Sequence, residues 1–431
     1  MKILIHRGTH TIGGSCIEIQ SREHRIILDL GMPLMGRDGV EIDEKTIKAP
    51  SIGNGILPDV AGLYKDQTPS IDAVILSHPH IDHYGLADYI HPSIPIYLSK
   101  GVQTLIEVGN IFYPQKTTIQ NCRNFEHWKQ FSIGPFSVTS YLMDHAGFDA
   151  SAFLIEADGK RIFYTGDFRA HGRKSKVFEH IINDPIKNVD CMIMEGTTLG
   201  GSHEGLNDEI DVEKKLYNIF TEQEDMSFVF ASGSNIDRLI SIYKAALKTG
   251  KILVFDLYTV YLLDQLKKNW PSLPPHQDDN IKVYYIKAHA DAIVEKMGKN
   301  FLYEYKDRKI EIADIVNDRR QMVLRLPISA MQRIAQNAVM GNPLDKAVFL
   351  YSMWSGYLEK NPSINRFCNQ YNIPIIKVHT SGHAYLNDLK RLMEALKPKA
   401  LIPIHTLSGD DFVNHFDNVV RIDDGTPFEV K

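Results

Sequence analysis

With 431 residues, the chain exceeds the size at which one hydrophobic core usually stops growing, so we expect two domains. Its hydrophobic fraction of 43% and charged fraction of 23% are those of a globular protein, and no apolar run approaches the roughly 20 residues that span a bilayer. The net charge of −5 argues against a uniformly basic nucleic-acid binder, so any surface for nucleic acid must be local.

The first two hundred residues predict short strands joined by tight turns. A hairpin is expected over residues 151–167, because two apolar runs flank Asp158-Gly159, a strong turn signal. Further apolar runs rich in β-branched and aromatic residues predict strands over residues 25–31, 71–78, 94–100, 136–144 and 190–196.

From about Asn207 the pattern changes to strands that alternate with helices, which predicts a parallel sheet with helical crossovers. The first helix begins at a cap formed by Asn207 or Asp208. Strands are predicted over residues 227–232, 251–256, 281–286, 321–328 and 347–352, and helices over 207–220, 235–250 and 257–270. After about Asn361 the chain returns to strand, helix and strand. This order predicts one domain inserted into another.

The cysteines are scattered and form no CxxC motif, so we expect free thiols and a cytoplasmic protein. They are Cys16, Cys122, Cys191 and Cys368.

The segment Ser77-His78-Pro79-His80-Ile81-Asp82-His83 directly follows the buried run AVIL and is the most informative part of the chain. Imidazole and carboxylate groups are ligands that suit zinc or manganese. A strand end can present His78 and His80 to one ion, while the following turn presents Asp82 and His83 to another. The alternative is a surface loop that happens to be rich in histidine.

The spacing HxHxDH resembles the signature of the metallo-β-lactamase superfamily, and the other family motifs match in order. Asp29 in LDLG resembles the first motif, His145 in MDHAGFDASAF the third and Asp167 in YTGDF the fourth. Each lies at the end of a predicted strand, where sites are usually built.

Three later residues resemble motifs A, B and C of the β-CASP group, which includes ribonuclease J. They are Glu195 in MIMEGTT, His383 in HTSGHAYLNDL and His405 in IPIHT. The resemblance implies an αββα metallo-β-lactamase sandwich with an inserted α/β domain. It implies a first part over residues 1–204, a β-CASP domain over 205–365 and a closing part over 366–431.

The family pattern implies two divalent metal ions, with zinc as the first choice and manganese as the alternative. Asp167 would bridge the two ions, with a water or hydroxide as the second bridge, and such a pair suits in-line displacement at phosphorus. The first ion would be held by His78, His80, His145 and Asp167, and the second by Asp82, His83, Asp167 and His405.

The resemblance also implies catalytic roles. His383 is the candidate general acid, kept cationic by Glu195, while Asp29 orients a ligand or the water, and Asp82 acts in catalysis as well as in metal binding. His379, four residues before His383, is the alternative for the motif B role.

Two short segments are candidates for binding a substrate phosphate. Ser232, Ser234 and Asn235 lie between a predicted strand and a helix, where backbone amides attract anions, and a plain helix cap is the equal alternative. Ser381 and Gly382 are the second candidates, through the resemblance to ribonuclease J.

The function implied is that of a metal-dependent phosphodiesterase acting on nucleic acid, namely a ribonuclease that cleaves from an end, internally or both. The expected partner is single-stranded RNA, with DNA as the alternative, no membrane, and a homodimer as a candidate assembly. Two other functions remain open: a small-molecule hydrolase of the same superfamily, and a non-catalytic nucleic-acid-binding protein.

Overall fold

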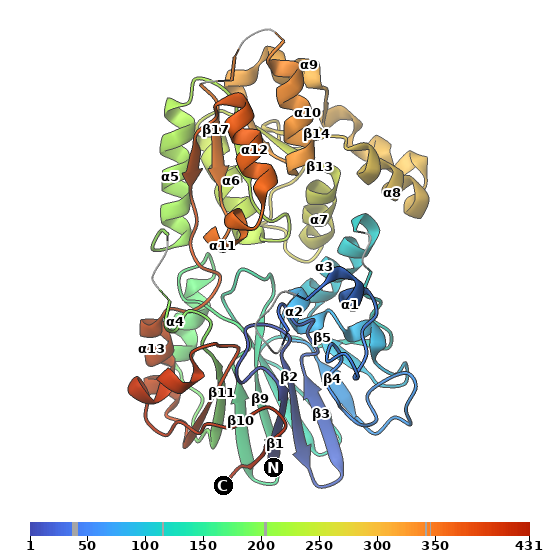
Figure 1. Cartoon of the computed structure of the whole chain (residues 1–431), viewed down its shortest axis with the longest axis vertical. Helices are drawn as coiled ribbons and strands as arrows, with labels where there is room; N and C mark the ends of the chain where they lie inside the picture. Colours follow the sequence, from blue (N-terminus) through green and yellow to red (C-terminus); the bar gives the residue numbers. More distant parts are fainter. Residues whose placement is uncertain (37–41, 114–115, 202–204, 341–342, 345) are drawn as a thin grey trace. The chain divides into compact units, whose positions relative to one another are not determined.

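The computed structural model describes residues 1–36, 42–113, 116–201, 205–340, 343–344 and 346–431. The chain divides into two compact units (Figure 1). Unit 1 comprises residues 1–106, 116–203 and 382–431, and unit 2 comprises residues 107–115 and 204–381. Within the described part of the chain, no helix has the length and apolar character needed to cross a membrane.

Unit 1 contains two sheets. The first has the order β20-β1-β2-β3-β4-β5-β6 and the second the order β19-β11-β10-β9-β8-β7. The strands of the first sheet are β1 (Lys2–Arg7), β2 (Cys16–Ser21), β3 (His24–Leu28), β4 (Ala73–Ile75), β5 (Ile96–Leu98), β6 (Cys122–Asn124) and β20 (Pro427–Glu429). Those of the second are β7 (Gln130–Ile133), β8 (Phe136–Leu142), β9 (Ser151–Ala157), β10 (Lys160–Tyr164), β11 (Cys191–Glu195) and β19 (Ala400–Ile404).

The two sheets pack face to face because alternate residues of each strand point to opposite faces. In β3, Ile26 and Leu28 enter a buried cluster shared with Phe153 and Ile193 of the second sheet, whereas Ile27 enters a cluster on the outer face. Helices cover both outer faces. They are α1 (Glu44–Lys48), α2 (Ile81–Tyr84), η1 (Ala87–Tyr89), α3 (Lys100–Phe112), α4 (Ser175–Asn183), α13 (Leu386–Leu396) and η4 (Gly409–Asn414). The predicted αββα sandwich is confirmed.

The predicted hairpin forms between β9 and β10, and its turn residues have the predicted geometry. Asp158 and Gly159 have φ values of 49° and 69°. Positive φ at both central residues is what a two-residue type I′ turn requires, and an Asp-Gly pair adopts it readily.

Unit 2 contains one sheet in the order β15-β14-β13-β16-β12-β17-β18, and each of its strand pairs is parallel. Its strands are β12 (Ser227–Phe230), β13 (Ile252–Asp256), β14 (Ile281–Tyr284), β15 (Lys309–Ile310), β16 (Met322–Arg325), β17 (Val348–Tyr351) and β18 (Ile375–Lys377). The predicted parallel sheet with helical crossovers is therefore present.

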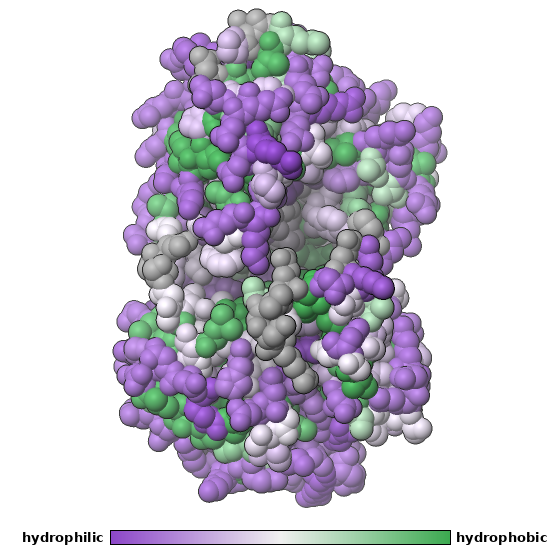
Figure 2. All heavy atoms as spheres, in the orientation of Figure 1, coloured by the Kyte–Doolittle hydropathy of each residue, from purple (hydrophilic) through white to green (hydrophobic). Residues whose placement is uncertain are grey.

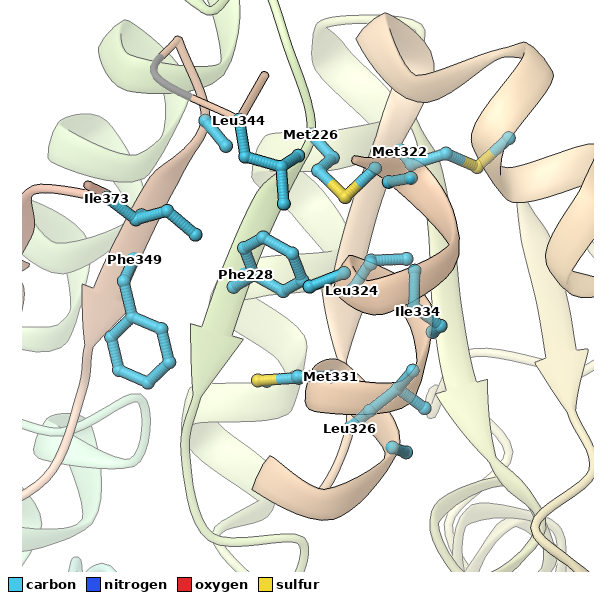
Figure 3. Packing of buried hydrophobic residues seen from close by; sticks show 14 of the residues in the cluster. Met226, Phe228, Met322, Leu324, Leu326, Met331, Ile334, Leu344, Phe349 and Ile373 are labelled. Carbon is cyan, nitrogen blue, oxygen red and sulfur yellow. The ribbon is translucent and has the colours of Figure 1, made fainter. Parts of the chain in front are cut away.

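Helices cover both faces of this sheet. On one face, Phe228, Leu324 and Phe349 of the sheet pack against Met331 and Ile334 of α10, as Figure 3 shows. The helices of unit 2 are α5 (Glu209–Glu222), α6 (Ile236–Lys248), α7 (Leu257–Lys267), α8 (Lys287–Met297), η2 (Lys299–Arg308), α9 (Ile312–Asn317), η3 (Arg319–Gln321), α10 (Ile328–Ala338), α11 (Ser355–Glu359) and α12 (Pro362–Tyr371). Both α6 and α7 contact β13.

Two segments belong to a different unit from the one expected, and one expected limit lies outside the described residues. The expected limit at residue 204 falls within residues 202–204, which lie outside the described part of the chain. The closing part of unit 1 begins at residue 382 rather than 366, because β18 pairs with β17 in the sheet of unit 2. Residues 107–115, expected in the first domain, belong to unit 2.

The surface visible in Figure 2 is mainly hydrophilic and the cysteines are unpaired, as expected from the sequence of a globular protein without a CxxC motif. Figure 2 shows mainly hydrophilic side chains on the visible face of the chain. The four cysteines are free thiols, as predicted, and burial raises the pKa of Cys191 and Cys368 to about 12.

Candidate metal centre

The predicted ligands follow strands of unit 1 that run in the same direction within each sheet. In the first sheet, β3 and β4 are parallel. In the second, β8 and β10 are both antiparallel to β9, while β10, β11 and β19 are parallel. The carboxyl ends of these strands therefore meet at one edge of each sheet, and the side chains that follow them converge.

Three histidines form the first group of candidate ligands. His78 Nε2 lies 3.2 Å from His80 Nδ1, and His145 Nε2 lies 3.1 Å from the same nitrogen. His78 and His145 are fully buried. The ring of His80 makes an angle of 84° with that of His78 and of 69° with that of His145. Three imidazole nitrogens that face one point are a typical arrangement for binding a transition-metal ion.

Asp82, His83 and His405 form the second group. His405 Nε2 lies 3.2 Å from Asp82 Oδ2, and His83 Nε2 lies 3.9 Å from it. One oxygen of Asp167 lies between the groups: Oδ2 is 3.6 Å from His78 Nε2, 3.2 Å from His83 Nε2 and 3.8 Å from His405 Nε2. The structure thus brings all seven predicted ligands together, with Asp167 in the shared position.

The protonation states of the first group and of Asp167 suit metal binding. For His83, burial would lower the pKa, but Asp167 and Asp29 raise it well above the ordinary value. Burial, followed by repulsion from neighbouring imidazoles, holds the pKa of His78 and His145 well below the ordinary value, and burial lowers the pKa of His80 to about 4. Burial alone would raise the pKa of Asp167, but His405 and His83 hold it well below its usual range. Neutral imidazoles and an ionised carboxylate are the forms that ligate metals.

The residues present fit divalent cations. Asp29, Asp167 and Glu195 are at most 2% exposed, and burying carboxylates together is costly without nearby positive charge. His83 Nε2 is buried without a hydrogen-bond partner, although it lies 3.2 Å from Asp167 Oδ2. A buried nitrogen left in this way beside carboxylates is placed to ligate a cation.

Asp29 orients the HxHxDH segment. Its Oδ1 accepts a hydrogen bond from the Ser77 amide at 2.7 Å, and its Oδ2 lies 2.8 Å from His83 Nδ1. The same oxygen accepts hydrogen bonds from Ser77 Oγ and Tyr164 OH, both at 2.7 Å, and Ser77 Oγ lies 3.0 Å from His78 Nδ1. Ser77 and Tyr164 were not among the predicted site residues. Ser77 could have been identified from the sequence, because its hydroxyl directly precedes the motif histidine His78.

Glu195 and His383 form a pair beside the ligands. His383 Nδ1 lies 3.2 Å from Glu195 Oε1 and 3.7 Å from Asp167 Oδ2. Glu195 is held in place because its two oxygens accept hydrogen bonds from the amides of Phe168 and Thr197. Burial would lower the pKa of His383, but the charge of Glu195 and its hydrogen bond raise that pKa to about 9.

Thr197 also orients a predicted ligand, and the sequence analysis missed it. Its Oγ1 lies 2.9 Å from His405 Nδ1, so the other ring nitrogen, Nε2, faces Asp82. Such contacts on the second nitrogen of a ligating histidine set its orientation. Thr197 lies two residues after Glu195 in the segment MEGTT, and this closeness to a motif residue could have identified it as a site residue.

His379 and the first set of phosphate candidates belong to unit 2, whereas the ligand cluster belongs to unit 1. His379 belongs to unit 2, where its Nδ1 lies 3.4 Å from Nη1 of Arg238. In the same unit, Asn235 is the cap of α6 and accepts a hydrogen bond from the Arg238 amide at 3.1 Å, while Ser232 Oγ lies 2.9 Å from Ser234 Oγ. The structure thus shows the helix cap, and the phosphate contact stays a prediction.

Of the second phosphate candidates, Gly382 lies in unit 1 beside the cluster. A Cβ on it would meet Ala146 Cβ at 3.0 Å and His145 Cε1 at 3.8 Å. Ser381 is the last residue of unit 2. A phosphate contact of either residue also stays a prediction.

The backbone of the HxHxDH segment is fixed by a close approach of two loops at Gly31. A Cβ on Gly31 would lie 1.6 Å from the carbonyl oxygen of Asp82. The same approach is held by hydrogen bonds from the amide of Leu30 to His83 O and from the amide of Met32 to Ile81 O. Only glycine allows this contact between the two backbones.

Gly31→Ala is therefore expected to displace Asp82 and His83, and to lower the metal retained per chain. Overpacking of this kind typically costs at least about 1–3 kcal/mol, so the melting temperature should fall as well. Elemental analysis after dialysis and a thermal melt measure the two effects. Gly53→Ala is the matched control, because the nearest atom to its Cβ is 4.0 Å away. Equal metal content in the two variants would contradict this role of Gly31.

Two family models match the chain. The beta-lactamase superfamily domain matches residues 57–208, which include six of the seven predicted ligands. The Zn-dependent metallo-hydrolase RNA specificity domain matches residues 372–415, which include His383 and His405. The matches thus cover the two parts of the chain from which the cluster is built.

Several curated ribonuclease J proteins resemble the chain at low identity. The protein of Mycoplasma genitalium is 20% identical over 94% of this chain and 67% of its own length. That of Sinorhizobium meliloti is 23% identical over 81% of this chain and 60% of its own length. That of Corynebacterium glutamicum is 21% identical over 94% of this chain and 53% of its own length. The chain thus spans between about half and two thirds of these relatives.

A solved structure has a similar fold over its whole length. A protein of unknown function from Enterococcus faecalis V583 superposes with a TM-score of 0.77 at 21% sequence identity, covering 99% of each chain. At this identity the likeness concerns the fold alone. The matched models and the curated relatives, together with the ligand cluster, support a metallo-β-lactamase protein that is similar to ribonuclease J.

Proposed function

We propose that the protein is a metal-dependent phosphodiesterase that cleaves single-stranded RNA. The observation that carries this proposal is the cluster of seven buried or half-buried ligand side chains in two groups, with Asp167 Oδ2 within 3.2–3.8 Å of a histidine nitrogen from each group. The match to an RNA specificity domain and the names of the curated relatives support RNA as the substrate.

We also propose that unit 2 is the β-CASP domain. Along the sequence, the residues of its parallel sheet come between the two parts of the chain that form the sandwich, as the β-CASP resemblance implies. This assignment favours a polymeric substrate over a small molecule, because an added domain of 178 residues between positions 204 and 381 supplies further surface for a strand.

Hydrolysis of a phosphodiester breaks one P–O bond, adds a hydroxyl from water to phosphorus and returns a proton to the leaving sugar oxygen. Two divalent cations, with zinc as the first choice, would supply the Lewis acidity and the lowered water pKa that this reaction needs at neutral pH. His78, His80 and His145 would hold one cation, and Asp82, His83 and His405 the other, with Asp167 shared.

The residues around the ligands have two further tasks in this proposal. Asp29 keeps Nδ1 of His83 turned toward itself, so that Nε2 faces Asp167. The His383 imidazolium would share its Nδ1 proton with Glu195 and give its Nε2 proton to the leaving sugar oxygen.

The first test of this proposal is the metal content. Protein reconstituted with zinc or manganese and then dialysed should retain close to two ions per chain, because the structure offers two groups of three ligands and Asp167 Oδ2 lies within 3.8 Å of a histidine from each. Elemental analysis measures this ratio directly. A content below one ion per chain would remove the proposed mechanism.

The substrate is tested with end-labelled single-stranded RNA and DNA that carry either a 5′-phosphate or a 5′-hydroxyl, with zinc or manganese. We expect RNA cleavage, and the product ladder separates attack from an end from internal attack. An aryl phosphodiester is included as a substrate without bases. Hydrolysis of the aryl ester without cleavage of RNA or DNA would favour a small-molecule hydrolase, and no hydrolysis by the metal-loaded protein would favour a binding protein.

A further inference from the structure

Two aromatic side chains are exposed at the carboxyl edge of the parallel sheet in unit 2. Trp354 is 54% exposed and Tyr357 is 50% exposed. Their rings lie 5.3 Å apart at 89°. Trp354 follows β17 by three residues and caps α11, which Figure 1 labels. Ligands of parallel sheets usually bind at this edge. We name Trp354 and Tyr357 the aromatic platform.

The indole of Trp354 packs against the backbone of Gly356. A Cβ on Gly356 would lie 2.3–2.7 Å from three atoms of the six-membered indole ring, so this ring lies against the bare backbone of Gly356. The backbone beneath is fixed as well, because Tyr351 OH donates a hydrogen bond to Trp354 O at 3.0 Å. One face of the ring is therefore supported, and its large exposed fraction leaves another part open to a ligand.

A cation lies beside the platform. Lys377 ends β18, the neighbour of β17, and its exposed Nζ donates a hydrogen bond to Ser355 Oγ at 3.1 Å. Glu359 and Lys360, which follow on α11 and its end, offset each other's charge. An aromatic face next to a lysine is the combination that binds single-stranded nucleic acid, because bases stack on the ring and the cation attracts the phosphates.

We propose that Trp354 stacks on a base of bound single-stranded RNA, with Lys377 beside the phosphate backbone of the same strand. This inference rests on the proposed function, since it names a substrate contact of the proposed ribonuclease. It concerns binding alone, because Trp354 and Lys377 belong to unit 2 and none of the ligand cluster does.

Trp354→Ala is expected to raise the KM for a short oligouridylate by roughly 5- to 150-fold, which is the contribution of one stacked base. The kcat should change little, and the hydrolysis rate of an aryl phosphodiester should match that of the unaltered protein. Trp354→Phe should lie between the two, because phenylalanine keeps a smaller ring. Gly356→Ala should also weaken RNA binding, because its Cβ displaces the indole.

Trp128→Ala is the matched control. Trp128 is also exposed, at 42%, and its ring contacts Tyr141 at 5.1 Å and 84°, but it lies in unit 1. This variant should bind RNA like the unaltered protein. An oligonucleotide with abasic sites throughout should bind the unaltered protein and Trp354→Ala equally, because it has no base to stack.

Lys377→Ala should lower the slope of log affinity against log salt concentration by about 0.7, the value for one phosphate contact on a single strand. Trp354→Ala should leave that slope unchanged, because stacking releases no counterion. The two residues are thus separable by a salt titration.

The failure of this inference differs from a failure of the proposed function. If RNA is cleaved and Trp354→Ala leaves its KM unchanged, the stacking contact is wrong and the ribonuclease proposal stands. An equal defect of Trp354→Ala on abasic and ordinary RNA would also overturn stacking, since the contact would then be to the backbone. If the unaltered protein neither binds nor cleaves RNA, both proposals fall together.

Discussion

His80→Ala is expected to lower the metal content from about two ions per chain to about one. His80 Nδ1 is the nitrogen to which His78 and His145 both point, at 3.2 and 3.1 Å, so its loss opens the first group. The second group keeps Asp82, His83 and His405. Phosphodiester hydrolysis should fall by on the order of 10³-fold or more, because metal Lewis acidity supplies several kcal/mol of transition-state stabilisation.

The control for this prediction is His10→Ala. His10 is exposed, its Nε2 pairs with Asp423 Oδ1 at 2.8 Å, and it belongs to none of the groups of candidate ligands. Its metal content and activity should equal those of the unaltered protein. Full metal retention by His80→Ala, measured by elemental analysis on the dialysed protein, would contradict the assignment of the first group.

His383→Ala is expected to slow RNA cleavage by about 10²- to 10⁴-fold, the usual contribution of a positioned proton donor, while the metal content stays near two ions. The reason is the pairing of His383, whose Nδ1 lies nearer to Glu195 Oε1, at 3.2 Å, than to Asp167 Oδ2, at 3.7 Å. The defect should shrink for an aryl phosphodiester with a good leaving group, since that oxygen departs with less protonation. Single-turnover kinetics on both substrates measure the difference.

Glu195→Gln should resemble a mild form of His383→Ala. It keeps the shape of the side chain and an oxygen for one of the two backbone amides that Glu195 now binds, but removes the charge that favours the imidazolium. Equal defects of His383→Ala on both substrates would indicate that His383 positions the strand or the metals. Loss of an ion would make it a ligand, which its place within 4.8 Å of Asp167 and His405 allows. Normal RNA cleavage would remove His383 from the mechanism and leave His379 as the candidate.

The positions of the candidate ligands could be predicted from the sequence because each follows a strand whose apolar run is easy to recognise. Asp29 follows β3, the HxHxDH segment follows β4, and Asp167 follows β10. What could not be predicted was the set of hydroxyls that orient the histidines. Tyr164 reaches Asp29 across 135 positions of the chain and Thr197 reaches His405 across 208, and such contacts exist only once the sheets have packed.

Among the strands that were not predicted, β6 and β7 lie at the edges of the two sheets of the sandwich. β6 and β7 are largely exposed or half-buried and carry no continuous apolar run, so their local sequence gives no strand signal. They form because β5 and β8 offer unpaired backbone groups. β18 was recognised as a strand, but an apolar run does not state its partner, and it pairs in unit 2 rather than in the sandwich.

The contact between His405 and Asp82 joins residues 323 positions apart, with the whole of unit 2 encoded between them. At about 5–20 residues per second, a ribosome needs roughly 15 to 65 s to synthesise that interval. Throughout this time the nascent chain has His78, His80, Asp82 and His83 but lacks the histidine that completes the second group. Translation order thus delays the assembly of the second ligand group until β19 has emerged, and a chain that stops prematurely within unit 2 lacks His405.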